Sequence, residues 1–129
     1  MDVRDWAHRY ARAWQNRDAD AAAALFTEDA TYRSSPFEEP YRGRDGVRRY
    51  WSEVTSTQEN VEVAIGRTLV DGNHALVEWW TQMDNAGTPV TLPGALLLDF
   101  DESGLCRALR EYWNLEIGAR VQPHDGWGA

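Results

Sequence analysis

One acidic residue lies on the apolar face of a segment whose side chains alternate. Residues 104–116 read GLCRALREYWNLE, and in a strand successive side chains point to opposite faces. Leu109, Glu111 and Trp113 then share one face. A carboxyl group buried beside an indole has a raised pKa and can transfer protons near neutral pH. Glu111 is therefore the first candidate catalytic residue; the alternatives are an ion pair with Arg107 or Arg33, or partial exposure at the rim of the fold.

A second candidate group is the phenol of Tyr10, which lies on the apolar stripe of the first predicted helix. Aimed into a pocket, its hydroxyl could stabilise negative charge on a substrate carbonyl oxygen. The alternative is a core residue with one satisfied hydroxyl. Trp14 and Trp51 are expected to be structural residues or walls of the same pocket.

Metal chemistry is not expected. His8, His74 and His124 are far apart in sequence, and no ligand spacing links them. Cys106 is the only cysteine, which excludes an intrachain disulfide and a thiolate metal cluster. We expect no cofactor and a reducing, cytoplasmic location.

Predicted helices position the candidates Tyr10, Trp14 and Trp51. Apolar residues recur at helical spacing over residues 3–16, and a second, alanine-rich helix is expected over residues 21–26. A short strand at 30–33 and a proline-containing loop at 34–40 follow. Residues 43–46 lead into a third helix, which carries Trp51.

Strands are predicted to position Glu111. After Asn60 the period changes to two, and strands are expected over 61–70, 75–83, 90–100 and the segment that holds Glu111. Pro93–Gly94 suggests a bulge or bend. Three helices and then a strand meander predict one α+β domain over residues 1–129, with a curved, mainly antiparallel sheet around the helices and a tail at 117–129 without a clear period.

Composition narrows the possible partners. The net charge of −8 disfavours nucleic acid and anionic membranes. No apolar run approaches the roughly 20 residues that span a bilayer, and the N-terminus lacks the apolar core of a signal peptide. Aromatic residues make up 12% of the chain, including seven tryptophans, which favours a pocket for a flat apolar ligand.

Several stretches resemble the NTF2-like superfamily, and within it the SnoaL-like polyketide cyclases and ketosteroid isomerases. They are Tyr10, residues 18–20, 25–31, 41–43, 47–51 and 104–114. The resemblance implies a cone-shaped fold with an interior pocket. This fold hosts isomerases, cyclases, dehydratases, epoxide hydrolases and non-catalytic binding modules, so it does not fix the chemistry.

The resemblance also tests individual positions. Tyr10 matches the isomerase tyrosine that donates to an enolate oxygen, but Ser34 and Leu96 stand where those enzymes carry acids. Steroid isomerisation is therefore not expected, and the epoxide hydrolase pair of Asp residues around an Arg has no clear counterpart. An acid on a later strand serves as base in SnoaL-like cyclases. Glu111 fits that role, whereas the amide of Asn114 cannot act as a base.

The expected site follows from this comparison. Glu111 and Tyr10 would be catalytic, with Ser34 contributing at most a hydrogen bond. The expected substrate-binding residues are Trp14, Tyr32, Ser34, Trp51, Trp79, Thr81, Met83, Leu96 and Trp113. The expected function is cofactor-free acid–base chemistry, such as a cyclase, isomerase or dehydratase step, on a small apolar or aromatic molecule that contains a carbonyl. The alternative is a non-catalytic binding module. A homodimer through the outer sheet face, covering an exposed Trp80, is also expected.

Overall fold

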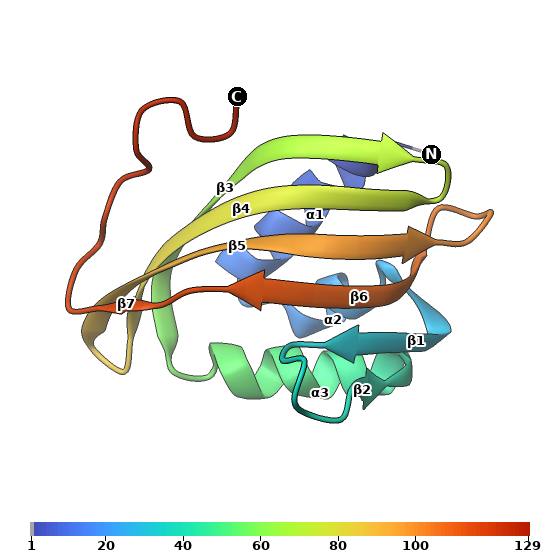
Figure 1. Ribbon diagram of the computed structural model, residues 1–129. Helices are drawn as coiled ribbons and strands as arrows, with labels where there is room; N and C mark the ends of the chain where they lie inside the picture. Colours follow the sequence, from blue (N-terminus) through green and yellow to red (C-terminus); the bar gives the residue numbers. More distant parts are fainter. Residues whose placement is uncertain (1) are drawn as a thin grey trace.

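Three helices pack on one face of a single curved sheet (Figure 1). The computed structural model describes residues 2–129. The helices are α1 (Val3–Gln15), α2 (Ala19–Ala23) and α3 (Gly43–Thr55). The strands are β1 (Phe26–Arg33), β2 (Tyr41–Arg42), β3 (Gln58–Asp71), β4 (His74–Asn85), β5 (Thr88–Phe100), β6 (Cys106–Trp113) and β7 (Glu116–Ile117). The expected α+β architecture, with three helices on a curved, mainly antiparallel sheet, is confirmed.

The helix α1 begins at a capped N-terminus and buries one aromatic stripe. The Asp2 carboxylate accepts hydrogen bonds from the backbone N–H groups of Arg4 and Asp5, which have no partner inside the helix. Trp6, Tyr10 and Trp14 recur four residues apart and are all buried. This stripe supplies much of the core between α1 and the sheet.

The last long strand, β6, lies inside the sheet between β1 and β5. The strand order of the sheet is β2-β1-β6-β5-β4-β3, and β7 pairs with β5 beyond the end of β6. Only β1 and β6 pair in parallel; the other pairs are antiparallel. Glu111 on β6 lies directly opposite Leu96 on β5. The candidate acid therefore sits in the middle of the sheet.

The second helix and the first strand differ from the prediction. The helix covers Ala19–Ala23 only, and the Asp18 carboxylate caps it by accepting from the N–H of Ala21. The strand β1 already begins at Phe26, which pairs with Cys106 on β6. Pairing between distant segments therefore overrides the helix propensity of the alanine-rich run.

Of the bulge or bend predicted at Pro93–Gly94, the bulge is wrong. The strands β4 and β5 pair without a register shift from Asn85 opposite Thr88 to His74 opposite Asp99. The glycine serves close packing instead. A Cβ atom at Gly94 would lie 2.5 Å from the ring of Trp79 and 2.6 Å from the carbonyl oxygen of Tyr112.

The expectation that Trp80 needs a second chain to cover it is also wrong. The indole of Trp80 points to the outer face, as predicted, but the C-terminal tail lies against it. Its N–H donates to the carbonyl of Val121, and its ring packs edge-on against Trp127. Trp80 is only partly exposed as a result.

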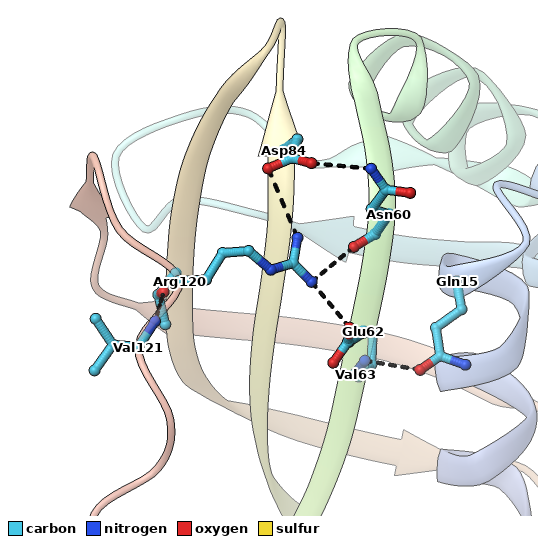
Figure 2. A network of polar contacts seen from close by, with 8 residues as sticks. Gln15, Asn60, Glu62, Val63, Asp84, Arg120 and Val121 are labelled. Atoms are coloured by element: carbon cyan, nitrogen blue, oxygen red, sulfur yellow. Dashed lines mark hydrogen bonds and ion pairs between the residues drawn. The ribbon is translucent and has the colours of Figure 1, made fainter.

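An ion-pair cluster holds the tail to the sheet (Figure 2). The guanidinium of Arg120 donates to the carbonyl of Asn60 and lies 3.1 Å from Glu62 and 3.8 Å from Asp84. The hydroxyl of Thr91 donates to the carbonyl of Ala119. The tail that showed no period in the sequence is therefore a strap fixed across β3, β4 and β5.

Candidate functional site

Glu111 is buried, as the strand alternation predicted. Only 6% of the surface of Glu111 is exposed to solvent, and Leu109 on the same face is also buried. The alternatives of an ion pair with Arg107 or Arg33 and of partial exposure at the rim are wrong. The partners of the carboxyl group are tyrosine hydroxyls from β1 and α3.

Three tyrosines from three elements converge on this carboxyl group. The hydroxyl of Tyr50 on α3 donates to Glu111 Oε1 at 3.1 Å, and that of Tyr32 on β1 donates to the same atom at 3.4 Å. The hydroxyl of Tyr10 on α1 lies 2.8 Å from the Tyr32 hydroxyl. Because Tyr32 gives its proton to Glu111, Tyr10 donates to Tyr32.

The second carboxyl oxygen of Glu111 is left free. Among the described residues, no group donates a hydrogen bond to Oε2. Oε2 is also not one of the unpaired polar atoms that are fully enclosed, and Glu111 lines a cavity. The tyrosines thus hold one oxygen while the other faces the space that a ligand would occupy.

Burial raises the pKa of Glu111 from 4.5 to about 8. Desolvation disfavours the charged form, and the hydrogen bonds from Tyr50 and Tyr32 act in the opposite direction. The pKa values of Tyr10, Tyr32 and Tyr50 lie well above 10, chiefly because of burial and then because of the nearby Glu111 charge. At neutral pH this group is therefore a carboxylic acid surrounded by neutral phenols.

The cavity beside Glu111 has a volume of about 200 Å³ and opens where β6 ends. Its walls are mostly aromatic and aliphatic. Trp113 and Leu115 stand at the opening, with 45% and 46% of their surfaces exposed. The indole N–H of Trp113 donates to the carbonyl of Ser34, so the loop after β1 is tied to the same rim.

The predicted binding residues divide into two groups. Trp14, Trp51, Trp79, Met83 and Trp113 line the cavity together with Glu111. The others do not line it: Tyr10, Tyr32, Ser34, Thr81 and Leu96.

The residues of the second group surround the cavity wall. Tyr10 and Tyr32 are linked to Glu111 through hydrogen bonds, whereas Thr81 and Leu96 are buried in the core, with Leu96 directly opposite Glu111 in the sheet. Ser34 contributes its backbone carbonyl at the rim rather than its hydroxyl. The structure therefore places Tyr10 behind Tyr32, and not at the surface that a ligand touches.

Sequence reasoning missed three polar residues of the cavity, Tyr50, Gln58 and Asn85. Tyr50 lies on the apolar side of the third predicted helix, a pattern that predicts packing and not a polar contact. Gln58 precedes the predicted strand, although the structure extends β3 to include it. Its Oε1 accepts the indole N–H of Trp14 at 2.8 Å, which leaves its NH₂ group free to donate. The only feature of the sequence that could have indicated Gln58 as a cavity residue is its polar side chain just before a predicted strand.

A family profile described as a SnoaL-like domain matches residues 7–109. The chain belongs to the SnoaL-like family. The match ends just before Glu111, so it covers the fold and most of the cavity but not the acid itself. None of the curated proteins matches the chain by sequence.

Solved structures show the same fold. A protein from Catenulispora acidiphila with a ketosteroid isomerase-like fold, in complex with trimethylamine, is 24% identical with a TM-score of 0.75, and 83% of each chain is covered. The epoxide hydrolase/cyclase-like enzyme SalBIII, which acts in pyran ring formation in salinomycin, is 21% identical with a TM-score of 0.77 over 88% of this chain and 94% of that one.

A third similar structure is a LEH-like epoxide hydrolase from M. tuberculosis. It is 22% identical with a TM-score of 0.71, covering 85% of this chain and 80% of that chain. At these identities the likeness establishes the shared fold. The chemistry of this chain has to be argued from its own residues.

Two further features of the described chain bear on the site. Between residues 2 and 129, no three His, Cys, Asp or Glu side chains are grouped so that they could hold a metal ion. None of the helices in that range is long and apolar enough to cross a membrane.

Proposed function

We propose that this protein catalyses proton transfer next to a carbonyl group of a small, largely apolar molecule. The observation that carries the proposal is the free Oε2 of Glu111, which borders an aromatic cavity while Oε1 is held by two tyrosines. An oxygen that is held in place, unpaired and poorly solvated is suited to general acid–base catalysis. The chemistry uses side chains alone and calls for no cofactor.

The proposed step moves one proton. In the ionised form of Glu111, Oε2 takes a proton from the carbon beside the carbonyl, the C–H electrons form the enolate, and the negative charge collects on the carbonyl oxygen. The NH₂ group of Gln58 lies in the cavity wall and is the donor we assign to that oxygen. Tyr10 acts as a positioning residue, because its hydroxyl orients Tyr32 and through it Glu111.

Exchange of carbon-bound hydrogen tests this function without knowledge of the natural substrate. A panel of small cyclic and aromatic ketones is incubated in D₂O, and loss of the signal of the hydrogen next to the carbonyl is followed by NMR. We expect native protein to accelerate exchange for at least one ketone by about 10²-fold or more over Glu111→Gln. Tyr112→Phe, a change on the outer face of the same strand, should match the native rate. Equal rates for native protein and Glu111→Gln would refute the proposal.

A second candidate function is ligand binding without catalysis. Ser34 and Leu96 stand where the isomerases have acids, so only one carboxyl group borders the cavity. The similar protein from Catenulispora acidiphila was crystallised with a small amine, trimethylamine. The exchange experiment separates the two functions, because a binding module would retain ligand affinity and show no exchange.

We also propose that the protein forms a homodimer through the uncovered half of the outer sheet face. The strap closes the part around Trp80, but a groove of about 420 Å³ remains beside it. Its floor includes Leu76 and Leu97. Arg33 and Arg110 stand on its β1–β6 side, and Asp71 and Asp99 lie toward β3–β5. A second copy related by a two-fold axis would place each basic side against the acidic side of its partner.

A further inference from the structure

Among the residues that the structure describes, the cavity beside Glu111 contains one ionisable acid and no basic side chain. Glu111 is its only carboxyl group, and no Arg, Lys or His is among the described residues that line it. Anionic ligands such as carboxylates or phosphates therefore find no compensating charge. The charge pattern favours a ligand that is neutral or cationic.

The aromatic walls distinguish between these two possibilities. Trp14 and Trp51 lie 5.2 Å apart at 58°, and Trp14 and Trp79 lie 5.2 Å apart at 67°. Tyr50 and Trp51 lie 5.3 Å apart at 84°. Rings inclined this steeply form adjoining walls rather than a stack. Several aromatic rings around one small space form the type of cage that binds quaternary ammonium groups through cation–π contacts.

We propose that the cavity binds a small organic ammonium ion, held among the rings of Trp14, Trp51 and Trp79 with its charge balanced by Glu111. This inference rests on the site of the proposed function and names its ligand class. It assigns the positive charge to the substrate, because the protein supplies none in this cavity.

The cation would also convert Glu111 into a base. With a pKa of about 8, this group is about nine-tenths protonated at pH 7 in the free protein. A positive charge nearby favours the carboxylate, so binding expels the proton to solvent and leaves Oε2 ionised. The titratable groups that face Glu111 are Tyr10 from α1, Tyr32 from β1 and Tyr50 from α3, and their pKa values lie well above 10. They remain neutral, so the released proton comes from Glu111.

Two ligands of similar shape and different charge test the proposal. Choline carries a quaternary ammonium, and 3,3-dimethyl-1-butanol replaces its nitrogen with carbon. Titration calorimetry at pH 7, repeated in buffers with different ionisation enthalpies, measures affinity and proton release together. We expect choline to bind at least about tenfold more tightly and to release close to one proton. The neutral analogue should release none.

The pH dependence supplies a second readout. Choline binding should tighten by about tenfold per pH unit between pH 6 and 8 and level off above that. Glu111→Gln should lose both proton release and the preference for choline. Glu116→Gln on β7 removes an exposed acid and should behave as native protein. The calorimetric result for native protein stands even if Glu111→Gln does not fold.

Failure here differs from failure of the proposed function. Equal affinity for the two ligands, no detectable choline binding, or choline binding without proton release would overturn the cation proposal. Carbon-bound hydrogen exchange could still occur with neutral ketones in that case. Conversely, proton release by choline without any hydrogen exchange would support the cation site and refute the acid–base function.

Discussion

Among the acidic side chains, Glu111 is the one whose pKa its surroundings change most. Its neighbours are phenols and indoles, which offer hydrogen bonds to one oxygen but no positive charge. Two hydrogen bonds do not offset the desolvation of a buried carboxylate, so the acid form is favoured well above its usual pH range. The same features that raise the pKa leave Oε2 available for proton transfer.

This shift predicts an unusual dependence of stability on pH. Since the pKa of Glu111 rises from 4.5 in the unfolded chain to about 8 in the fold, its stabilising contribution is complete below pH 4.5 and is lost as pH rises to about 8. The slope contributed by this group is about −1.4 kcal/mol per pH unit within that window. Urea unfolding from pH 5 to 9 should show that Glu111→Gln lacks this slope and exceeds native protein in stability at pH 9. Parallel profiles would contradict the prediction.

At this scale the sequence located the acid but not all of its partners. Alternation along the last long strand was enough to put Glu111 and Trp113 on one face. Tyr50 could not be recognised, because a tyrosine on the buried stripe of a helix has the same pattern whether it packs or donates. Tyr10 was chosen by resemblance, and only the tertiary structure shows that Tyr32 stands between it and Glu111.

At the scale of elements, the position of one cavity-wall residue depends on a glycine in the neighbouring strand. The ring of Trp79 on β4 lies over Gly94 on β5, where any Cβ atom would collide with it. The outer face has a related contact, in which the ring of Trp127 lies on Gly66 of β3. The first contact is enclosed by the sheet, whereas the second involves the tail.

These two glycines give a matched pair of substitutions. Gly94→Ala places Cβ 2.5 Å from Trp79 and 2.6 Å from the Tyr112 carbonyl, so we expect a loss of about 1–3 kcal/mol of unfolding free energy and a displaced Trp79. Gly66→Ala meets the far edge of the Trp127 ring at 2.9 Å, in the mostly exposed last residues beyond the Arg120 anchor, where a small shift is cheap, so its loss should be under about 0.5 kcal/mol. Thermal unfolding and tryptophan fluorescence measure both effects. A larger loss for Gly66→Ala would show that the strap is the more rigid contact.

The long elements were predictable, and the short ones were not. The stripe of α1 and the alternation of β4 carry their period over many residues, and both elements formed as expected. The two residues of β7 have no period to read, because they pair with β5 only where β6 has ended. The strap likewise depends on Arg120 meeting acids from β3 and β4, a contact between distant segments that local pattern does not encode.

For the whole molecule, the strap divides the outer sheet face into a covered half around Trp80 and an uncovered half beside it. In the covered half, the tail of the same chain packs on Trp80. The uncovered half keeps an apolar groove with basic residues on one side and acidic residues on the other. This polarity is the reason we propose a two-fold dimer rather than an open chain of molecules.

A single substitution tests the dimer. Light scattering coupled to gel filtration should give native protein a mass twice the 14.7 kDa of one chain. Leu97→Glu places a charge on the groove floor and should give the mass of a single chain, because an unpaired carboxylate would be buried between the copies. Phe37→Glu changes the most exposed apolar side chain, which does not line the groove, and should leave the dimer intact. A native mass of one chain would refute the proposed dimer.

The central claim is that the Glu111 side chain is a neutral acid in the wall of an aromatic cavity at pH 7. Protein with ¹³C-labelled glutamate carboxyl groups, titrated by NMR and assigned by comparison with Glu111→Gln, measures this directly. We expect the Glu111 resonance to titrate with a pKa of about 8, while those of exposed glutamates titrate near their usual value of about 4.3. A Glu111 resonance that titrates together with the exposed glutamates would contradict the account.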